Sequence, residues 1–319
     1  MMLSRIADSL FWIARYMERA EDTARILDVN YHMLLEQSAK TIRLRWDPLV
    51  SIVGEHERFP EFFEEATAQN VFEFLAFHPG NSNSIVNCIG HVRENARTIR
   101  DRISREMWED VNGLYHRVGR FRAAEEIAVG PHRFCNVIKF ASHQFHGVSD
   151  DTLPRDEGWH FLQAGRALER AEMTARIVDV EYQKLYEGLA PGSQPDNHQW
   201  MAVLQSVAAY EIYRREYHSR IEPERVAELL ILHPQHPRSI RFNIATLQQS
   251  LRAISGSGPG SYANEAERLI GKLHDTLTYD RIEEIFARGL HIFLVDLQKT
   301  CRLIGEHIAR TYFYYAVVA

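Results

Sequence analysis

Cysteine is scarce in this chain of 319 residues. The three cysteines, Cys88, Cys135 and Cys301, lie far apart and include no Cys-x-x-Cys pair. A disulfide framework needs an even set of cysteines and a thiolate zinc site needs paired ones, so the sequence excludes both classes. This cysteine usage is typical of a reducing compartment, and charged residues begin at Arg5, too early for a signal peptide. We therefore expect a cytoplasmic protein.

Long apolar runs and an excess of positive charge are missing as well. No apolar run approaches the roughly 18 residues that a membrane-spanning helix needs. The chain has 37 lysine and arginine residues against 43 aspartate and glutamate residues, a net charge of −6. Proteins that bind nucleic acids usually carry a net charge of the opposite sign. We expect neither a membrane nor a nucleic acid as partner.

The short motifs of several common enzyme classes are absent too. There is no phosphate-binding Gly-x-x-x-x-Gly-Lys-[Ser/Thr] loop, no Gly-x-Gly-x-x-Gly, no Gly-x-Ser-x-Gly and no His-Glu-x-x-His element. A di-iron bundle needs two Glu-x-x-His elements, and only Glu157-x-x-His160 is present. His143-x-x-His146 could hold a metal, but the sequence places no carboxylate beside it. We expect no metal and no cofactor.

What remains is a strong helical pattern. Glycine and proline number only 17 and 11, and apolar residues recur at steps of three and four through most of the chain. No hairpin signal accompanies them, so the sequence predicts an all-α protein. In the first half we expect helices over residues 4–36, 46–53, 60–66, 70–76, 84–115 and 131–147, followed by a turn at 149–154.

The chain contains an internal repeat. Residues 15–29 read RYMERAEDTARILDV and residues 166–180 read RALERAEMTARIVDV, identical at 11 of 15 positions. Residues 75–89 and 230–244 also correspond, sharing a His-Pro and a Ser-Ile pair. The sequence therefore predicts two tandem-duplicated helical bundles of about 150 residues, 1–151 and 152–319, packed with pseudo-twofold symmetry. They could form two domains or one fused helical body.

Charged residues of the repeated helix form the first candidate site. Their side chains recur at steps of three, four and seven, which places them along one side of a helix. Most of these charges are kept between the copies, while core positions differ. The exception is Asp22, whose counterpart Met173 is neutral. This pattern is compatible with a buried polar seam, a ligand or partner site, or exposed ion pairs. The candidates are Arg15, Glu18, Arg19 and Arg25, with Arg166, Glu169, Arg170 and Arg176.

A second candidate site begins at Ser84. Ser84 can cap the helix that follows His78-Pro79, which is the simpler interpretation. A helix N-terminus also offers free N–H groups to an anion, and Arg93 and Arg97 follow within the next turns. The functional hypothesis is therefore an anion or ligand site.

These residues together resemble the bacterial alpha-E family, a helical domain named for its Glu-Arg motif. The resemblance covers nearly the whole chain and lies in the doubled ERAxxTARxxDV element, Ser84-Ile85, Arg93-Glu94-Asn95-Ala96-Arg97, Glu106-Met107-Trp108 and Arg155-Asp156-Glu157-Gly158-Trp159-x-Phe161.

The resemblance implies a protein that works beside a circularly permuted ATP-grasp ligase, and often a transglutaminase-like protease, in a peptide-forming or peptide-modifying system. The family's Glu-Arg pair corresponds to Glu18-Arg19 and Glu169-Arg170, and its asparagine-arginine segment corresponds to Asn95 and Arg97. The second copy has Ser250 and Arg252 at the latter positions. A site using Asn95 would therefore not be strictly doubled.

Three functions remain open. The first is a noncatalytic helical partner that binds the ATP-grasp ligase or its peptide product. The second is an enzyme acting on a peptide or amide, with Glu18 or Glu169 as general base and Arg19 or Arg170 holding a carboxylate. The third is a homo-oligomeric scaffold. Position discriminates among them: pairs that converge on an open pocket favour a site, whereas pairs that fill each other favour a seam.

Overall fold

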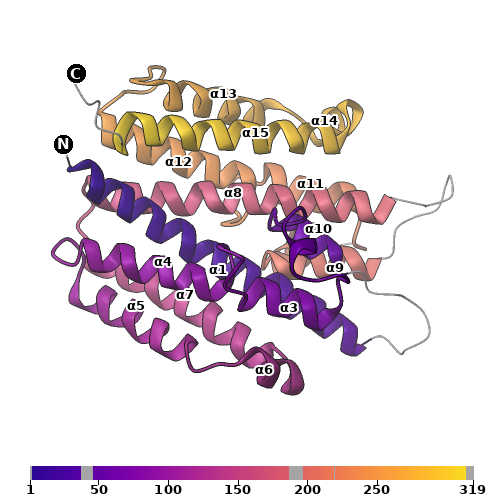
Figure 1. Cartoon of the computed structure of the whole chain (residues 1–319). Helices are drawn as coiled ribbons and strands as arrows, with labels where there is room; N and C mark the ends of the chain where they lie inside the picture. The colour runs from indigo at the N-terminus through magenta and orange to yellow at the C-terminus, as the bar shows by residue number, and fades with distance from the viewer. Residues whose placement is uncertain (1, 37–45, 187–196, 219, 314–319) are drawn as a thin grey trace.

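The computed structural model describes residues 2–36, 46–186, 197–218 and 220–313 of the chain (Figure 1). Within these ranges every regular element is a helix, as the sequence predicts. Among the described helices, none combines the length and the apolar character that a membrane crossing requires.

The described residues of the first half, 2–36 and 46–152, form seven α-helices and one short 3-10 turn. They are α1 (Ser4–Glu36), α2 (Asp47–Ile52), η1 (Phe59–Glu61), α3 (Ala68–Ala76), α4 (Ile85–Thr98), α5 (Arg105–Val118), α6 (Ala123–Val129) and α7 (His132–Thr152).

In the second half, the part of the chain that the structure describes forms eight α-helices and a last short π-helical turn. They are α8 (Glu157–Tyr186), α9 (Asn197–Ser206), α10 (Tyr210–Tyr217), α11 (Pro223–Leu232), α12 (Ile240–Ser255), α13 (Glu265–Tyr279), α14 (Ile282–Arg288), α15 (Leu290–Ile308) and η2 (Ala309–Phe313).

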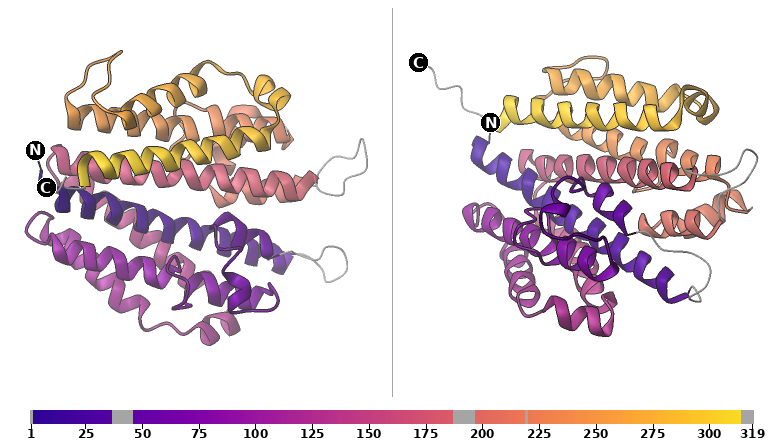
Figure 2. Two further views of the ribbon diagram at one scale, coloured as in Figure 1. Left: turned by 45° about the horizontal axis from the view of Figure 1, so that its top comes forward. Right: turned by 45° about the vertical axis from the view of Figure 1, so that its right-hand side comes forward.

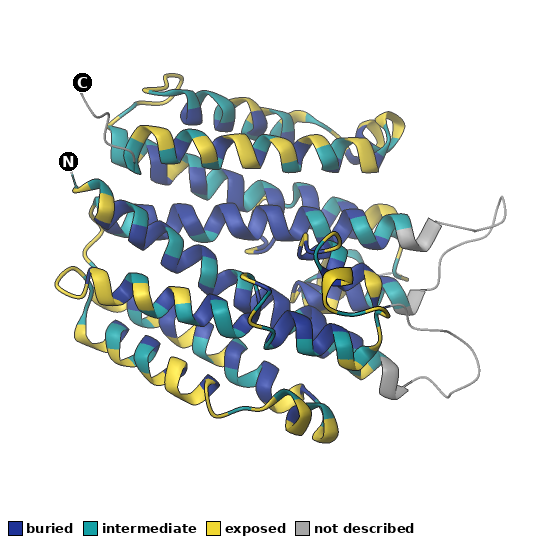
Figure 3. Ribbon diagram, in the orientation of Figure 1, coloured by how far each residue is buried: buried dark blue, intermediate teal, exposed yellow. Residues whose placement is uncertain are grey.

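The two longest helices, α1 and α8, pack against each other in the centre of the molecule (Figures 1 and 2). Helices α4 and α7 cover the outer side of α1, and α12 and α15 cover the outer side of α8. The halves also interlock, because α2 packs on α8 and α9 packs on α1. Neighbours on several sides bury most of α1 and α8, whereas α5 and α13 keep an exposed face (Figure 3).

Three helix boundaries differ from the sequence prediction. The helix expected over 84–115 is two helices, because the chain turns after Thr98 and Ser104 caps α5 by accepting a hydrogen bond from the Met107 amide. The helix expected over 60–66 is only the turn η1.

The third difference concerns the end of α7. The turn expected at 149–154 is helical as far as Thr152, and within this last stretch the Ser149 and Thr152 hydroxyls donate to carbonyls of their own helix. The chain leaves the helix at Leu153, whose extended backbone suits the proline that follows.

One glycine sets how closely the central helices approach. A Cβ atom at Gly165 of α8 would lie 2.2 Å from the carbonyl oxygen of Phe11 on α1, so no larger residue fits. The corresponding position in the first copy is Ala14, which is fully buried. Small residues on both helices thus bring the two backbones together, and with them the charged side chains beyond.

We predict that Gly165→Ala destabilises the protein by about 1–3 kcal/mol, because the added methyl group must push α8 away from α1. The matched control is Gly113→Ala in α5, where a Cβ atom would meet nothing within 4 Å. That change should be neutral or stabilising, since alanine favours helix over glycine. Thermal melts of both variants test this. Equal melting temperatures would show that the close contact at Gly165 does not limit how α1 and α8 pack.

Candidate functional site

The charged side chains of the repeated helix meet each other across the contact of α1 with α8. Helical spacing places Arg15, Glu18 and Arg19 on the side of α1 that faces α8. Glu18 has no exposed surface and Glu169 only 3%. Both carboxylates are therefore removed from water, and their charges need partners inside the protein.

Glu169 of α8 is held by two arginines of α1. The Arg15 Nε atom donates to Glu169 Oε2 at 2.6 Å, and Arg19 Nε donates to Glu169 Oε1 at 2.6 Å. Arg15 also donates from Nη2 to Glu172 at 2.5 Å. Each of the two carboxylates thus receives at least one charge-assisted hydrogen bond.

Glu18 of α1 is held in the reciprocal way by two arginines of α8. Arg166 Nε donates to Glu18 Oε1 at 3.2 Å and Arg170 Nε donates to Glu18 Oε2 at 2.7 Å. These are the counterparts of Arg15 and Arg19 in the repeat. In addition, the Nε2 atom of the buried His146 on α7 lies 2.7 Å from Glu18 Oε1.

The arginines keep both central carboxylates ionised. Burial alone would raise the pKa of Glu169, but Arg19 and Arg15 hold that pKa at about 2. Burial is likewise opposed at Glu18, where Arg170, His146 and Arg166 hold the pKa well below its usual value. The Glu169 charge therefore stabilises the fold above the ordinary pKa of 4.5, and this contribution is lost as pH falls towards 2.

The one charge that the repeat does not keep has its own partner. Arg238, in the segment before α12, contacts Asp22 through Nη1 and donates to Glu21 at 2.5 Å through Nη2. In the repeat, Met173 of the second copy answers Asp22, and Asn83 of the first copy answers Arg238 in the aligned His-Pro segments. A carboxylate and a guanidinium are thus lost together.

Asp22 is the least well balanced of the buried carboxylates. Burial raises its pKa to about 7 against the opposing effect of Arg238, and the nearby Glu18 and Glu21 raise it further. Its Oδ2 atom is buried and has no hydrogen-bond partner in the described part of the chain.

The buried ion pairs of Glu18, Glu21, Asp22 and Glu169 with their arginines are called the seam below. Arg25 and Arg176 lie at its margins. Arg25 donates to Glu21 at 2.8 Å, and its Nη2 atom is 3.0 Å from His143 Nε2. Arg176 is partly buried and lies close to Gly54, just after α2. Within the described ranges, Arg176 has no carboxylate at ion-pair distance.

Sequence reasoning missed several members of the seam. Asn83 accepts from Arg19 at 2.5 Å and donates to the buried Glu55 at 2.6 Å. Arg238 and His146 lie in segments where the neighbouring residues show no periodic pattern of charges. The alignment of 75–89 with 230–244 held a usable signal, because it already pairs Asn83 with Arg238.

The second set of candidates does not come together. Ser84 is buried and caps α4, accepting from the Asn87 amide. Arg93, Asn95 and Arg97 lie nine or more residues later, roughly 13 Å or more along the helix axis. Their side chains are engaged locally: Arg93 with Asn112 and Glu94, Asn95 with the His91 carbonyl, and Arg97 with Glu94.

A cavity of about 420 Å³ opens beside the Glu169 end of the seam. It is lined by five arginines against two glutamates, with aromatic rings on one wall: Arg15, Arg19, Arg176, Arg302, Arg310, Glu172, Glu306, Phe11, Trp12 and Phe313. Within the ranges described above, Arg302 has no ion-pair partner, and Arg310 lies 3.8 Å from Glu306.

A glycine opens this cavity. His132 and His291 begin the corresponding stretches of α7 and α15, and fourteen residues later α7 carries His146 whereas α15 carries Gly305. His146 fills the space against Glu18, but Gly305 lines the cavity beside Arg15. The seam is therefore closed by a side chain at one end and open at the other.

Glu18, Glu21 and His146 are close enough to share a metal ion. Arg170, Arg166 and Arg238 already surround these carboxylates, and burial together with Arg166 lowers the pKa of His146. An added cation would have to displace guanidinium groups, so the residues present do not fit a metal.

Nearly the whole chain matches a described family. The alpha-E family, "a predicted alpha-helical domain with a conserved ER motif", matches residues 2–313. The chain belongs to the alpha-E family. The two Glu-Arg pairs at the centre of this alpha-E domain are the ones that form the seam.

The relatives that match this alpha-E chain are described only as uncharacterized proteins. Three uncharacterized proteins, one from Mycobacterium bovis and two from strains of Mycobacterium tuberculosis, are each 24% identical to it over 319 residues. The matches cover 92% of this chain and 34% of each relative, so the chain spans about a third of the relatives' length. No solved structure matches it significantly.

We predict that Glu18→Ala and Glu169→Ala each cost on the order of 3–5 kcal/mol in stability, because each leaves buried guanidinium groups without their carboxylate. Glu109→Ala, which breaks the exposed pair with Arg105 on α5, is the control and should melt close to wild type. Thermal and denaturant unfolding measure the difference. If all three variants melt with wild type, the Glu-Arg motif does not hold the fold.

Proposed function

We propose that this alpha-E chain is a noncatalytic helical module of the cytoplasm that binds an ATP-grasp ligase or its peptide product. The observation that carries the proposal is that the Glu-Arg pairs fill each other: Glu18 and Glu169 each receive two guanidinium groups in the buried α1–α8 contact. The motif then stabilises the contact between the two halves, and the ligase or its peptide binds to the surfaces beside the motif.

The same observation weighs against the enzyme alternative. A general base must accept a proton from a substrate near neutral pH and must lie within reach of it. Glu18 is fully buried, and its arginine partners hold its pKa well below the usual value after opposing the effect of burial. Glu169 is in the same position on the other helix.

The identity of the partner rests on the family resemblance. An ATP-grasp ligase, circularly permuted, is the enzyme beside which alpha-E proteins typically occur. The length of the mycobacterial relatives supports a shared task, because this segment forms about a third of each of those polypeptides. A domain joined to other domains in its relatives is a natural component of an assembly.

The arginine-rich cavity is the part of the surface best suited to a peptide or a ligase segment. Arg176 and Arg302 line it without ion-pair partners in the described chain, and guanidinium groups bind carboxylates with two parallel hydrogen bonds. Trp12 and Phe313 add apolar contact area. A C-terminal carboxylate or an acidic side chain would fit this combination.

We further infer that the chain is a duplicated unit, 1–151 and 152–319, arranged about a pseudo-twofold axis. Reciprocal ion pairs support this, since Arg15 and Arg19 bind Glu169 as Arg166 and Arg170 bind Glu18. The packing of α2 on α8 and of α9 on α1 favours one fused body over two separable domains.

The test is to purify the chain and the ATP-grasp protein of the same cell, and to measure ATP consumption and amide formation for each alone and for both together. We expect no turnover by the chain alone, binding to the ligase or to its peptide product, and a changed ligase output in the mixture. Turnover by the isolated chain would favour the enzyme. A ligase that neither binds nor responds would favour the scaffold.

Variants locate the binding surface. Replacing Arg176 and Arg302 together by alanine should weaken binding by about a hundredfold or more, since each lost charge-assisted bond contributes roughly 1.5–3 kcal/mol. Arg105→Ala is the control, because Arg105 is an exposed arginine of α5 that does not line the cavity. Unchanged affinity in the double variant would move the binding surface elsewhere.

A further inference from the structure

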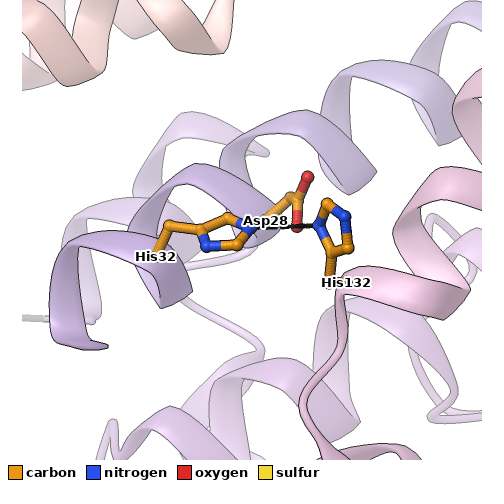
Figure 4. A group of neighbouring side chains, drawn as sticks. All are labelled: Asp28, His32 and His132. Atoms are coloured by element: carbon orange, nitrogen blue, oxygen red, sulfur yellow. Dashed lines mark hydrogen bonds and ion pairs between the residues drawn. The ribbon is translucent and has the colours of Figure 1, made fainter. Parts of the chain in front are cut away.

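A second cluster of titratable side chains lies near the end of α1, apart from the Glu-Arg seam. Asp28 and His32 stand one helical turn apart on α1, and His132 is the first residue of α7 (Figure 4). Figure 4 shows both imidazole rings turned towards the Asp28 carboxylate. Asp28 is ten residues beyond Glu18, roughly 15 Å along the axis, so this cluster is independent of the proposed function.

The three inward atoms form a nearly regular triangle. His132 Nδ1 lies 2.8 Å from Asp28 Oδ1, His32 Nε2 lies 3.0 Å from His132 Nδ1, and His32 Nε2 lies 3.5 Å from Asp28 Oδ1. Ligands at about 2.1 Å from a tetrahedral zinc ion are separated by roughly 3.3 Å. The triangle thus has the size of one face of such a coordination sphere.

Neighbouring groups hold two of the three ligands in place. Asp28 is buried, and Lys139 Nζ binds its Oδ2 atom at 2.6 Å, which leaves Oδ1 to face the histidines. The far nitrogen of His132, Nε2, is 2.7 Å from the Asn136 side-chain amide. Such outer contacts orient the ligands of metal sites.

The second copy supplies an internal comparison. Asp179 and His291 repeat the Asp28–His132 pair, with Nδ1 to Oδ1 at 2.6 Å. Gln183 takes the place of His32, and Gln298 takes the place of Lys139. The Asp–His pair is therefore common to both halves, whereas the third nitrogen ligand is present only in the first.

We propose that Asp28, His32 and His132 bind one divalent transition-metal ion of the class that prefers imidazole, such as Zn²⁺. Two imidazoles and one carboxylate suit Zn²⁺ and its neighbours rather than Mg²⁺ or Ca²⁺, which take oxygen ligands. The histidine side chains are about half exposed, so a water molecule completes the coordination from solvent. Metal binding at His132 Nδ1 requires the neutral tautomer with its proton on Nε2, so the proton on Nδ1 is released and one is taken up at Nε2.

The experiment measures Zn²⁺ binding to the full chain after chelator treatment and dialysis, by titration calorimetry. We expect one tight equivalent in wild type and a 10- to 100-fold or greater loss of affinity in His32→Gln, which copies the residue of the second half. Gln183→His is the converse variant and should add a second equivalent. His56→Gln, at an exposed histidine outside the cluster, is the control and should bind as wild type does.

Co²⁺ provides a second readout, because ligation by histidine nitrogen gives it a visible spectrum that depends on the ligands. That spectrum should appear in wild type and be lost in His32→Gln, while the circular dichroism and the metal-free melting temperature of the variant stay at wild-type values. Absence of stoichiometric Zn²⁺ binding in wild type, or equal affinity in wild type and His32→Gln, would overturn the proposal.

Discussion

The structure depends on one contact, in which the two central helices exchange buried ion pairs. Removing a carboxylate from water costs several kcal/mol unless the charge is paired and hydrogen-bonded, and each central glutamate here receives guanidinium groups from the opposite helix. Because the pairs run in both directions, α1 and α8 can meet in only one register. The outer helices pack on this pair, so the register of the seam fixes the arrangement of both halves.

Local charge balance also explains where the two halves differ. Arg238 of the second half accompanies Asp22 of the first, and the residues that correspond to them are neutral, Asn83 in the first half and Met173 in the second. The seam closes with His146 at one end and opens at Gly305 at the other, where the arginine-lined cavity lies. The two halves therefore differ in these contacts although residues 15–29 and 166–180 are identical at 11 of 15 positions.

The helical class and the importance of the repeated charges could be predicted from the sequence, because both depend on spacing within one segment. Periodic apolar residues gave the helices, and the agreement between residues 15–29 and 166–180 marked the seam. The break before Ser104 was missed because a single capping serine decides it. His146 and Arg238 were missed as partners because their contacts join segments more than a hundred residues apart, which no local pattern records.

A double-mutant cycle on Asp22 and Arg238 tests most directly whether buried charges in the seam are stabilised by their partners from the opposite half. Asp22→Met and Arg238→Asn each copy the other half of the chain and each leave a buried charge without its partner, whereas the double variant removes both charges and leaves Glu21 paired with Arg25. The double variant should be more stable than the sum of the two single effects allows, with a coupling of about 1–3 kcal/mol. Strictly additive losses would contradict it.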